Sequence, residues 1–153
     1  MSKLPVFLLA TALALPALAL PALAQQGQPG AHFIENWDLD EDGKVSLAEA
    51  TERRDDIFTT FDENEDDRLN AEEFAAFDAA RAADMAGQPG HGKGGQGRNG
   101  MRKVQQGMQR QFNDANGDGL VTRQEFLARV PAWFKTMDRS GDGAITTDDF
   151  GRG

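Results

Sequence analysis

Residues 114–125, DANGDGLVTRQE, decide the fold. This stretch carries oxygen-bearing side chains at its first, third, fifth, ninth and twelfth positions, with Gly119 at the sixth. Oxygen ligands at this spacing suit a hard cation such as Ca²⁺, because a glycine at the sixth position permits the sharp turn that brings them together. The predicted ligands are the side chains of Asp114, Asn116, Asp118, Thr122 and Glu125, with the backbone carbonyl of Leu120.

The same pattern recurs at residues 38–49 (DLDEDGKVSLAE), 62–73 (DENEDDRLNAEE) and 138–149 (DRSGDGAITTDD). In chain order the four stretches are called loops one to four. Each has an acid at the twelfth position and an aliphatic residue at the eighth, namely Val45, Leu69, Val121 and Ile145. Loops one and two have the same spacing along the chain as loops three and four. The sequence therefore predicts a duplicated two-loop unit.

The predicted ligands of the other three loops follow from the same positions. They are Asp38, Asp40, Asp42, Ser46, Glu49 and the Lys44 carbonyl in loop one; Asp62, Asn64, Asp66, Asn70, Glu73 and the Arg68 carbonyl in loop two; and Asp138, Ser140, Asp142, Thr146, Asp149 and the Ala144 carbonyl in loop four.

Loops two and four depart from the pattern of loop three. Loop two has Asp67 at the turn, where a left-handed residue other than glycine costs about 1 kcal/mol. Loop four closes with Asp149, whose side chain is one methylene shorter than glutamate. We expect both loops to bind calcium more weakly, and loop four to tolerate the smaller Mg²⁺.

These loops resemble the EF-hand superfamily, and the resemblance covers nearly all of the chain after residue 24. It implies calcium binding by loops that are each flanked by helices. Only a short segment separates loop one from loop two, and loop three from loop four, where calmodulin-type proteins have two helices and a turn. This compressed spacing is similar to the lanmodulin family of periplasmic lanthanide-binding proteins. Lanmodulin loops carry proline at the second position, where this chain has Leu39, Glu63, Ala115 and Arg139.

The short spacing has a geometric consequence. Residues 47–61 can form one shared helix of about 22 Å, which would hold loops one and two at opposite ends. We therefore predict that loop one pairs with loop four and loop two with loop three. Val45 would then face Ile145, and Leu69 would face Val121. Pro131 would kink or split the corresponding helix between loops three and four.

The predicted fold class is all-α, a compact EF-hand helical bundle with four metal loops and short β-bridges between paired loops. Phe33, Ile34 and Trp37 recur at helical spacing before loop one, and Met101, Val104, Met108 and Phe112 predict one helix before loop three. Trp37 and Trp133 are expected to be core residues on helix faces.

The N-terminal segment is typical of an export signal. Residue Lys3 precedes an apolar stretch at 4–20, and residues 22–24 (Ala-Leu-Ala) form a small-x-small cleavage site. A membrane anchor is the alternative, although the apolar stretch is short and contains prolines. We expect a signal peptide at residues 1–24 and a mature chain from Gln25, in a bacterial periplasm or secreted.

Residues 25–153 are predicted to form one four-loop domain. Residues 31–86 hold the first pair of loops, 87–100 form a glycine-rich linker, and 101–153 hold the second pair. Basic residues gather in and after the linker, which is either a solvated segment or a docking site for an anionic partner. They are Lys93, Arg98, Arg102, Lys103 and Arg110.

The amino-acid composition excludes several classes of binding site and partner. The net charge of −9 argues against nucleic acid and favours cations as partners. There is no cysteine, which excludes disulfides and thiolate metal sites, and the two histidines, His32 and His91, leave little for a zinc site or for catalysis. No nucleophile motif is present, so we do not expect an enzyme.

Three functions remain open from the sequence. The first is an exported calcium-binding protein that acts as a buffer or sensor, with an unidentified protein target and no membrane contact after signal cleavage. The second is a lanthanide-binding periplasmic metallophore, because trivalent lanthanide ions favour the same oxygens. The third is a structural or interaction protein whose calcium sites only stabilise the fold.

Overall fold

The computed structural model describes residues 28–87 and 98–151. The predicted signal peptide and most of the predicted linker, including His91, lie outside these residues. Within the described part of the chain, no helix is long and apolar enough to cross a membrane.

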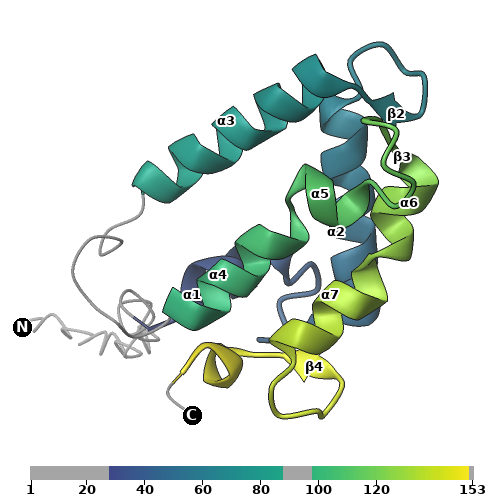
Figure 1. Ribbon diagram of the computed structural model, residues 1–153. Helices are drawn as coiled ribbons and strands as arrows, with labels where there is room; N and C mark the ends of the chain where they lie inside the picture. Colours follow the sequence, from purple (N-terminus) through teal and green to yellow (C-terminus); the bar gives the residue numbers. More distant parts are fainter. Residues whose placement is uncertain (1–27, 88–97, 152–153) are drawn as a thin grey trace, which may run out of the picture.

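The fold is mostly helical, as predicted (Figure 1). The first half of the chain forms α1 (Ala31–Trp37), β1 (Val45–Ser46), α2 (Leu47–Phe61), β2 (Arg68–Leu69) and α3 (Ala71–Gly87). The second half forms α4 (Arg98–Gly107), α5 (Arg110–Asn113), β3 (Val121–Thr122), α6 (Arg123–Ala128), α7 (Val130–Met137), β4 (Ala144–Ile145) and the 3-10 helix η1 (Thr147–Phe150).

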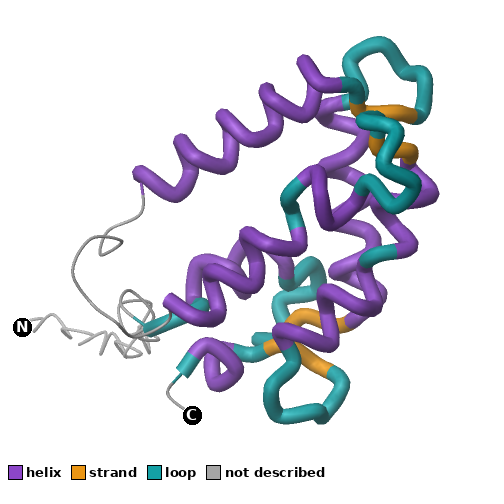
Figure 2. The backbone as a smooth tube through the Cα atoms, in the orientation of Figure 1, coloured by secondary structure: helices purple, strands orange, loops and turns teal. Residues whose placement is uncertain are grey.

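The four short strands form two antiparallel pairs at opposite ends of the molecule (Figure 2). In one pair, β1 with β4, Val45 lies opposite Ile145. In the other, β2 with β3, Leu69 lies opposite Val121. The predicted pairing of loop one with loop four, and of loop two with loop three, is confirmed.

Helix α2 separates the two ends and spans the residues predicted for the shared helix. It begins with a capping box, in which Ser46 and Glu49 each accept a hydrogen bond from the other's backbone N–H. Its buried face consists of Ala50, Arg54 and Phe58, at steps of four residues. The arginine in the middle of this stripe was not recognised from the sequence.

The second shared segment is split in two, as Pro131 predicts. Helix α6 ends at Ala128, and α7 begins at Val130 with the proline in its first turn. Because proline lacks an N–H and fixes φ, the first turn of a new helix tolerates it better than a helix interior does.

One predicted element is wrong. The apolar spacing between Met101 and Phe112 indicates a single helix, but α4 ends at Gly107 and α5 starts at Arg110. The break places Gly107 against Trp133, where an added Cβ would lie only 1.8 Å from the indole Cδ1. The tertiary contact with the indole overrides the local helical pattern. Helices also extend into both ends of the predicted linker, at Gly87 and at residues 98–100.

A core of aromatic side chains joins the two ends. At the end with loops one and four, the Trp37 and Trp133 rings have centroids 4.9 Å apart. Towards loops two and three, Phe126 lies 5.8 Å from Phe58 and 6.3 Å from Phe77. Both tryptophans are buried, which confirms their prediction as core residues.

Candidate metal centre

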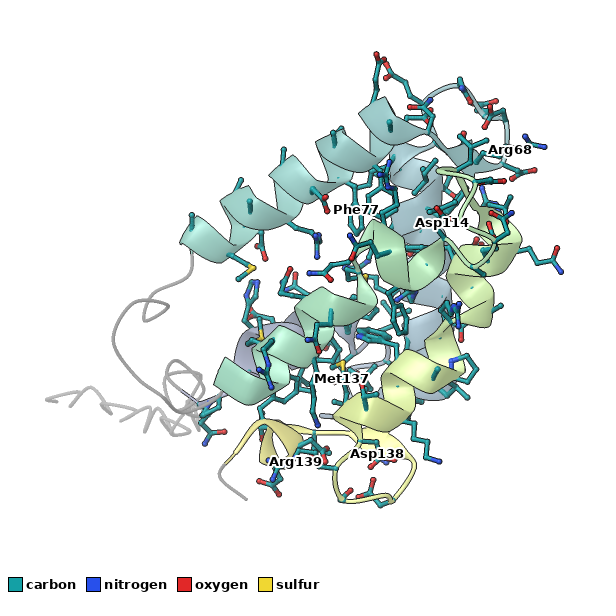
Figure 3. The ribbon with its side chains drawn as sticks, viewed as in Figure 1. Arg68, Phe77, Asp114, Met137, Asp138 and Arg139 are labelled. Carbon is teal, nitrogen blue, oxygen red and sulfur yellow. The ribbon has the colours of Figure 1, made fainter. Side chains whose placement is uncertain are left out.

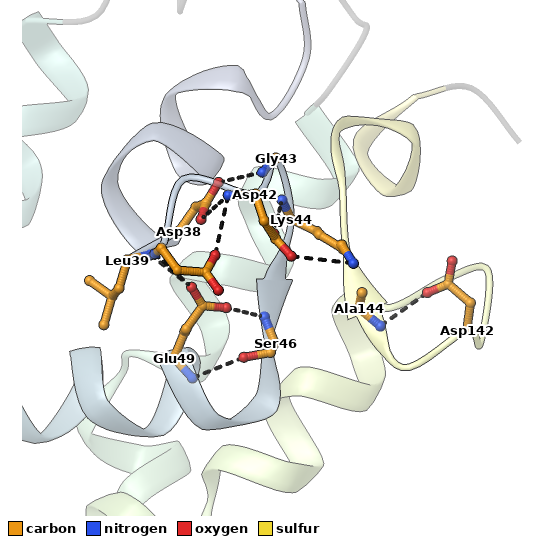
Figure 4. Close-up of polar contacts among 10 residues, drawn as sticks. Asp38, Leu39, Asp42, Gly43, Lys44, Ser46, Glu49, Asp142 and Ala144 are labelled. Carbon is orange, nitrogen blue, oxygen red and sulfur yellow. Dashed lines mark hydrogen bonds and ion pairs between the residues drawn. The ribbon is translucent and has the colours of Figure 1, made fainter.

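The first aspartate of every loop holds the turn at the sixth position. Its Oδ2 accepts a hydrogen bond from the sixth backbone N–H in all four loops, and Figure 4 shows this contact in loop one. The pairs are Gly43 to Asp38 at 2.8 Å, Asp67 to Asp62 at 3.0 Å, Gly119 to Asp114 at 3.0 Å and Gly143 to Asp138 at 2.9 Å.

The fifth and twelfth residues repeat in the same way. The fifth residue, always aspartate, accepts from the backbone N–H of the seventh at 2.8–3.1 Å, in the pairs Asp42–Lys44, Asp66–Arg68, Asp118–Leu120 and Asp142–Ala144. The twelfth acid accepts from the backbone N–H of the ninth residue at 2.7–3.0 Å, in the pairs Glu49–Ser46, Glu73–Asn70, Glu125–Thr122 and Asp149–Thr146. Four segments with different sequences therefore adopt one loop conformation.

The twelfth acid also reaches back to the start of its loop. It accepts from the backbone N–H of the second residue at 2.8–3.3 Å in each case. In loop four the shorter Asp149 makes these contacts, and the chain continues into η1, a tighter helix than the α-helices that follow the other loops. This carboxylate ties together both ends of the loop that it is predicted to close around an ion.

Exposure follows the same repeat. The eighth residue is fully buried in every loop, while the third and fifth residues are exposed. Asp62, Glu73 and Asp149 are buried, and the other acids at the first and twelfth positions are partly buried. Figure 3 shows Asp114 and Arg68 at one end of the molecule and Asp138 at the other. Each loop is therefore fixed to the core by its buried eighth residue, while its third and fifth residues face solvent with their side-chain oxygen atoms.

Loop one holds the densest group of acids. Carboxylate oxygens of Asp38, Asp40 and Asp42 lie within 4.8 Å of one another. Desolvation raises the pKa of Asp40, and the charges of Asp42, Glu49 and Asp38 raise it further against a backbone hydrogen bond that lowers it. Hard oxygen donors with mutual repulsion fit a divalent cation such as Ca²⁺, because the ion would neutralise them.

Two of the twelfth residues, Glu49 and Glu125, are held in their charged form. Hydrogen bonds from the Thr122 backbone and hydroxyl and from the start of loop three lower the pKa of Glu125, against the effect of burial. Burial would raise the pKa of Glu49, but hydrogen bonds from Ser46, Leu39 and Asp40 outweigh it and lower the value. Metal binding needs the deprotonated carboxylate, so these contacts prepare both residues as ligands.

In loops one to three the side chain of the ninth residue caps the helix that follows it. Ser46 Oγ and Thr122 Oγ1 accept from the N–H of the twelfth residue, both at 3.2 Å, and Asn70 Oδ1 accepts from Glu73 N–H at 3.1 Å. Lys44, predicted to contribute its carbonyl, places its ammonium 3.3 Å from the Asp42 carboxylate. The local ion pair of Lys44 offsets part of the negative charge of loop one.

Asp67 adopts the left-handed conformation predicted for it, with φ of 59°. Two more residues are left-handed, Glu41 and Glu65, at the fourth positions of loops one and two, and the sequence pattern did not predict them. Loops three and four have glycine there. Because each left-handed residue with a side chain costs about 1 kcal/mol or more, loops one and two carry more backbone strain than loops three and four.

Arg123 of loop three contacts the strained turn of loop two, which the sequence did not reveal. Its Nε donates to Asp67 Oδ1 at 2.8 Å, and its backbone N–H donates to the Asp67 carbonyl at 3.1 Å. The same guanidinium pairs with Asp55 of α2. The two paired loops are thus linked through charged side chains as well as through their strands.

A comparison with known protein families finds a match in the second half of the chain. The EF hand family model matches residues 111–130 and 132–153, which contain loops three and four. This match supports the EF-hand superfamily, whose domain suggests calcium binding. No curated protein matches the chain.

Proposed function

We propose that this protein is an exported calcium-binding protein in which all four loops bind a metal ion. One observation carries the proposal: loops one and two, which lie outside the family match, have the same hydrogen bonds at the first, fifth and twelfth residues as loops three and four. The predicted side-chain ligands stand at equivalent positions in each loop.

Binding would act through charge. Each loop gathers three or four carboxylates at its ligand positions, and their repulsion opposes the loop conformation when no ion is present. A divalent cation would neutralise them and would hold together the two helices that flank the loop. Hydrogen bonds from backbone N–H groups to these carboxylates reduce the repulsion between them before an ion binds.

The four sites are expected to differ in affinity. Loop one has four ligand carboxylates and a glycine turn, and loop three has glycine at both left-handed positions. Loop two carries two strained residues, and loop four closes with Asp149. We expect loops one and three to bind calcium more tightly than loops two and four. Affinities of about 0.1–1 mM are typical of extracellular modules.

The export part of the proposal rests on the sequence of residues 1–24. It places the protein in a bacterial periplasm or outside the cell, where it would act as a calcium buffer or sensor. A sensor would expose apolar surface when it binds calcium, and a buffer would not. Binding of an apolar dye with and without calcium separates the two.

Isothermal titration calorimetry with calcium, magnesium and lanthanum tests the function. Glu125→Gln should remove one tight calcium site, because glutamine keeps the capping contact but not the charge. Glu52→Gln, an equal charge change at an exposed position on α2, should leave the titration unchanged. An absence of calcium binding would overturn the proposal, and a strong preference for lanthanum over calcium would replace it with a lanthanide-binding function.

A further inference from the structure

Arg54 lies in the apolar stripe of α2 and is fully buried, with 0% of its surface exposed. Among the described residues, no carboxylate lies within ion-pair distance of its guanidinium. Burial lowers its pKa to about 9, so the group stays charged at neutral pH. A buried cation without a counter-ion is costly, and its neighbours must account for its presence.

The guanidinium is satisfied by uncharged acceptors and aromatic rings. One terminal nitrogen donates to the Gly107 carbonyl at 3.1 Å and contacts Met108 Sδ at 3.7 Å. The guanidinium carbon lies 4.0 Å from the Phe126 ring centroid and 5.2 Å from that of Trp133. Of the three nitrogens of this guanidinium group, Nε alone has no hydrogen-bond partner among the described residues.

The other terminal nitrogen touches both flanks of loop three. It donates to Asn113 Oδ1 at 2.6 Å and to the Phe126 carbonyl at 3.1 Å. Asn113 is the residue immediately before Asp114, and Phe126 is the residue immediately after Glu125. A single nitrogen of α2 therefore bridges the helix that enters loop three and the helix that leaves it.

Asn113 extends this bridge to the break between α4 and α5. Its Nδ2 donates to the carbonyls of Gly107 and Gln109, at 3.1 and 2.8 Å. The Gly107 carbonyl thus accepts from both Arg54 and Asn113, which closes a small buried network. Because Arg54, Asn113 and the Gly107 carbonyl are buried, a change in the spacing of the two helices would leave charged or polar atoms without partners.

We propose that Arg54 is a positioning residue that clasps the two helices flanking loop three and thereby sets the affinity of that loop for calcium. This inference rests on the proposed metal-binding function. The clasp holds both ends of the loop in place before the ion arrives, so less conformational entropy is lost on binding. It also ties loop three to α2, the helix that connects loops one and two.

Nuclear magnetic resonance titration with calcium tests this role loop by loop. The backbone N–H of Gly119 reports on loop three, and that of Gly43 reports on loop one, because each donates to the first aspartate of its loop. In Arg54→Met the calcium midpoint at Gly119 should rise by about tenfold or more, as for loss of a charge-assisted hydrogen bond. The midpoint at Gly43 should stay nearly unchanged.

Two further variants separate the clasp from charge and from general packing. Arg53→Met removes the same charge from the adjacent, more exposed position and should shift neither midpoint. Arg54→Lys keeps the charge but replaces the planar fork with a single nitrogen, so it should still raise the midpoint at Gly119. It is also the milder change if Arg54→Met fails to fold.

Three results would overturn the clasp alone: an unchanged Gly119 midpoint in the Arg54 variants, equal shifts at Gly119 and Gly43, or full recovery in Arg54→Lys. The equal shifts would mean that Arg54 only packs the core. A lack of any calcium response in the unsubstituted protein would overturn the proposed function together with this inference.

Discussion

Leu69→Ala tests the strand pairing between loops two and three. Leu69 and its partner Val121 are both fully buried. Removing a buried leucine side chain costs about 3–5 kcal/mol, because the lost contacts add to the cost of the cavity that remains. This is a large fraction of the roughly 5–15 kcal/mol by which small domains are stable. Leu47→Ala, at a position 41% exposed, should change stability by about 0.5 kcal/mol or less.

The assay is urea denaturation followed by circular dichroism, in the presence of a chelator. A double-mutant cycle then identifies the partner of Leu69. Leu69 and Val121 should show a coupling of about 0.5 kcal/mol or more, while Leu69 and Val45 should be additive. If Leu69 were coupled to Val45 and not to Val121, or if Leu69→Ala had no larger effect than Leu47→Ala, the pairing argument would be refuted.

Three other outcomes follow from the structure. Gly107→Ala should lower the free energy of unfolding by about 2 kcal/mol, because the added Cβ would overlap the neighbouring indole. Gly87→Ala, where a Cβ would meet open space, should leave the free energy of unfolding unchanged or raise it slightly. Equal effects of the two substitutions would contradict the close contact. Folding lowers the pKa of Glu125, so its carboxylate stabilises the protein above the ordinary value of 4.5 and less as the pH falls through the lower folded value. The stability difference from Glu125→Gln in chelator should therefore shrink on acidification, and a difference that grows would contradict the assignment. Arg123→Gln should weaken calcium binding at loop two by about twofold to fivefold, because it removes a partly exposed ion pair with Asp67. If calorimetry shows no change in calcium affinity, the ion pair does not support loop two.

The sequence predicted the topology because two local signals agree. The short segment between loops one and two has room for one helix, and α2 spans the predicted residues. A single straight helix separates its ends, so each loop must find its partner in the other half of the chain. The aliphatic eighth positions then specify the register, with Val45 opposite Ile145. Pro131 likewise acts locally, and it divides the second segment as expected.

The features that the sequence did not reveal depend on distant contacts. The break after Gly107 follows from an indole that lies far along the chain, and apolar spacing carries no information about that contact. Arg54 stands between Ala50 and Phe58 on the buried face of α2, but arginine is ordinarily a surface residue. It is buried here because the flanks of loop three supply its acceptors. Arg123 contacts the loop two turn only once the strands have paired.

The candidate site was more accessible to sequence reasoning than these contacts. The first, fifth and twelfth positions recur with the same hydrogen bonds in all four loops, because these hydrogen bonds join residues within each loop. The left-handed fourth positions of loops one and two were not predicted, because Glu41 and Glu65 are residue types that rarely adopt a positive φ. Loops three and four have glycine at these positions, which is the usual sequence signal for this conformation.

The most direct test of the account is a calcium titration that follows the backbone N–H of the sixth residue in each loop by nuclear magnetic resonance. These groups, in Gly43, Asp67, Gly119 and Gly143, all donate to the first aspartate of their loops. If all four loops bind metal, all four resonances will shift and saturate, with loops one and three responding at lower calcium than loops two and four. Shifts confined to Gly119 and Gly143 would contradict the central claim, because loops one and two would then have the conformation of a metal site without its function.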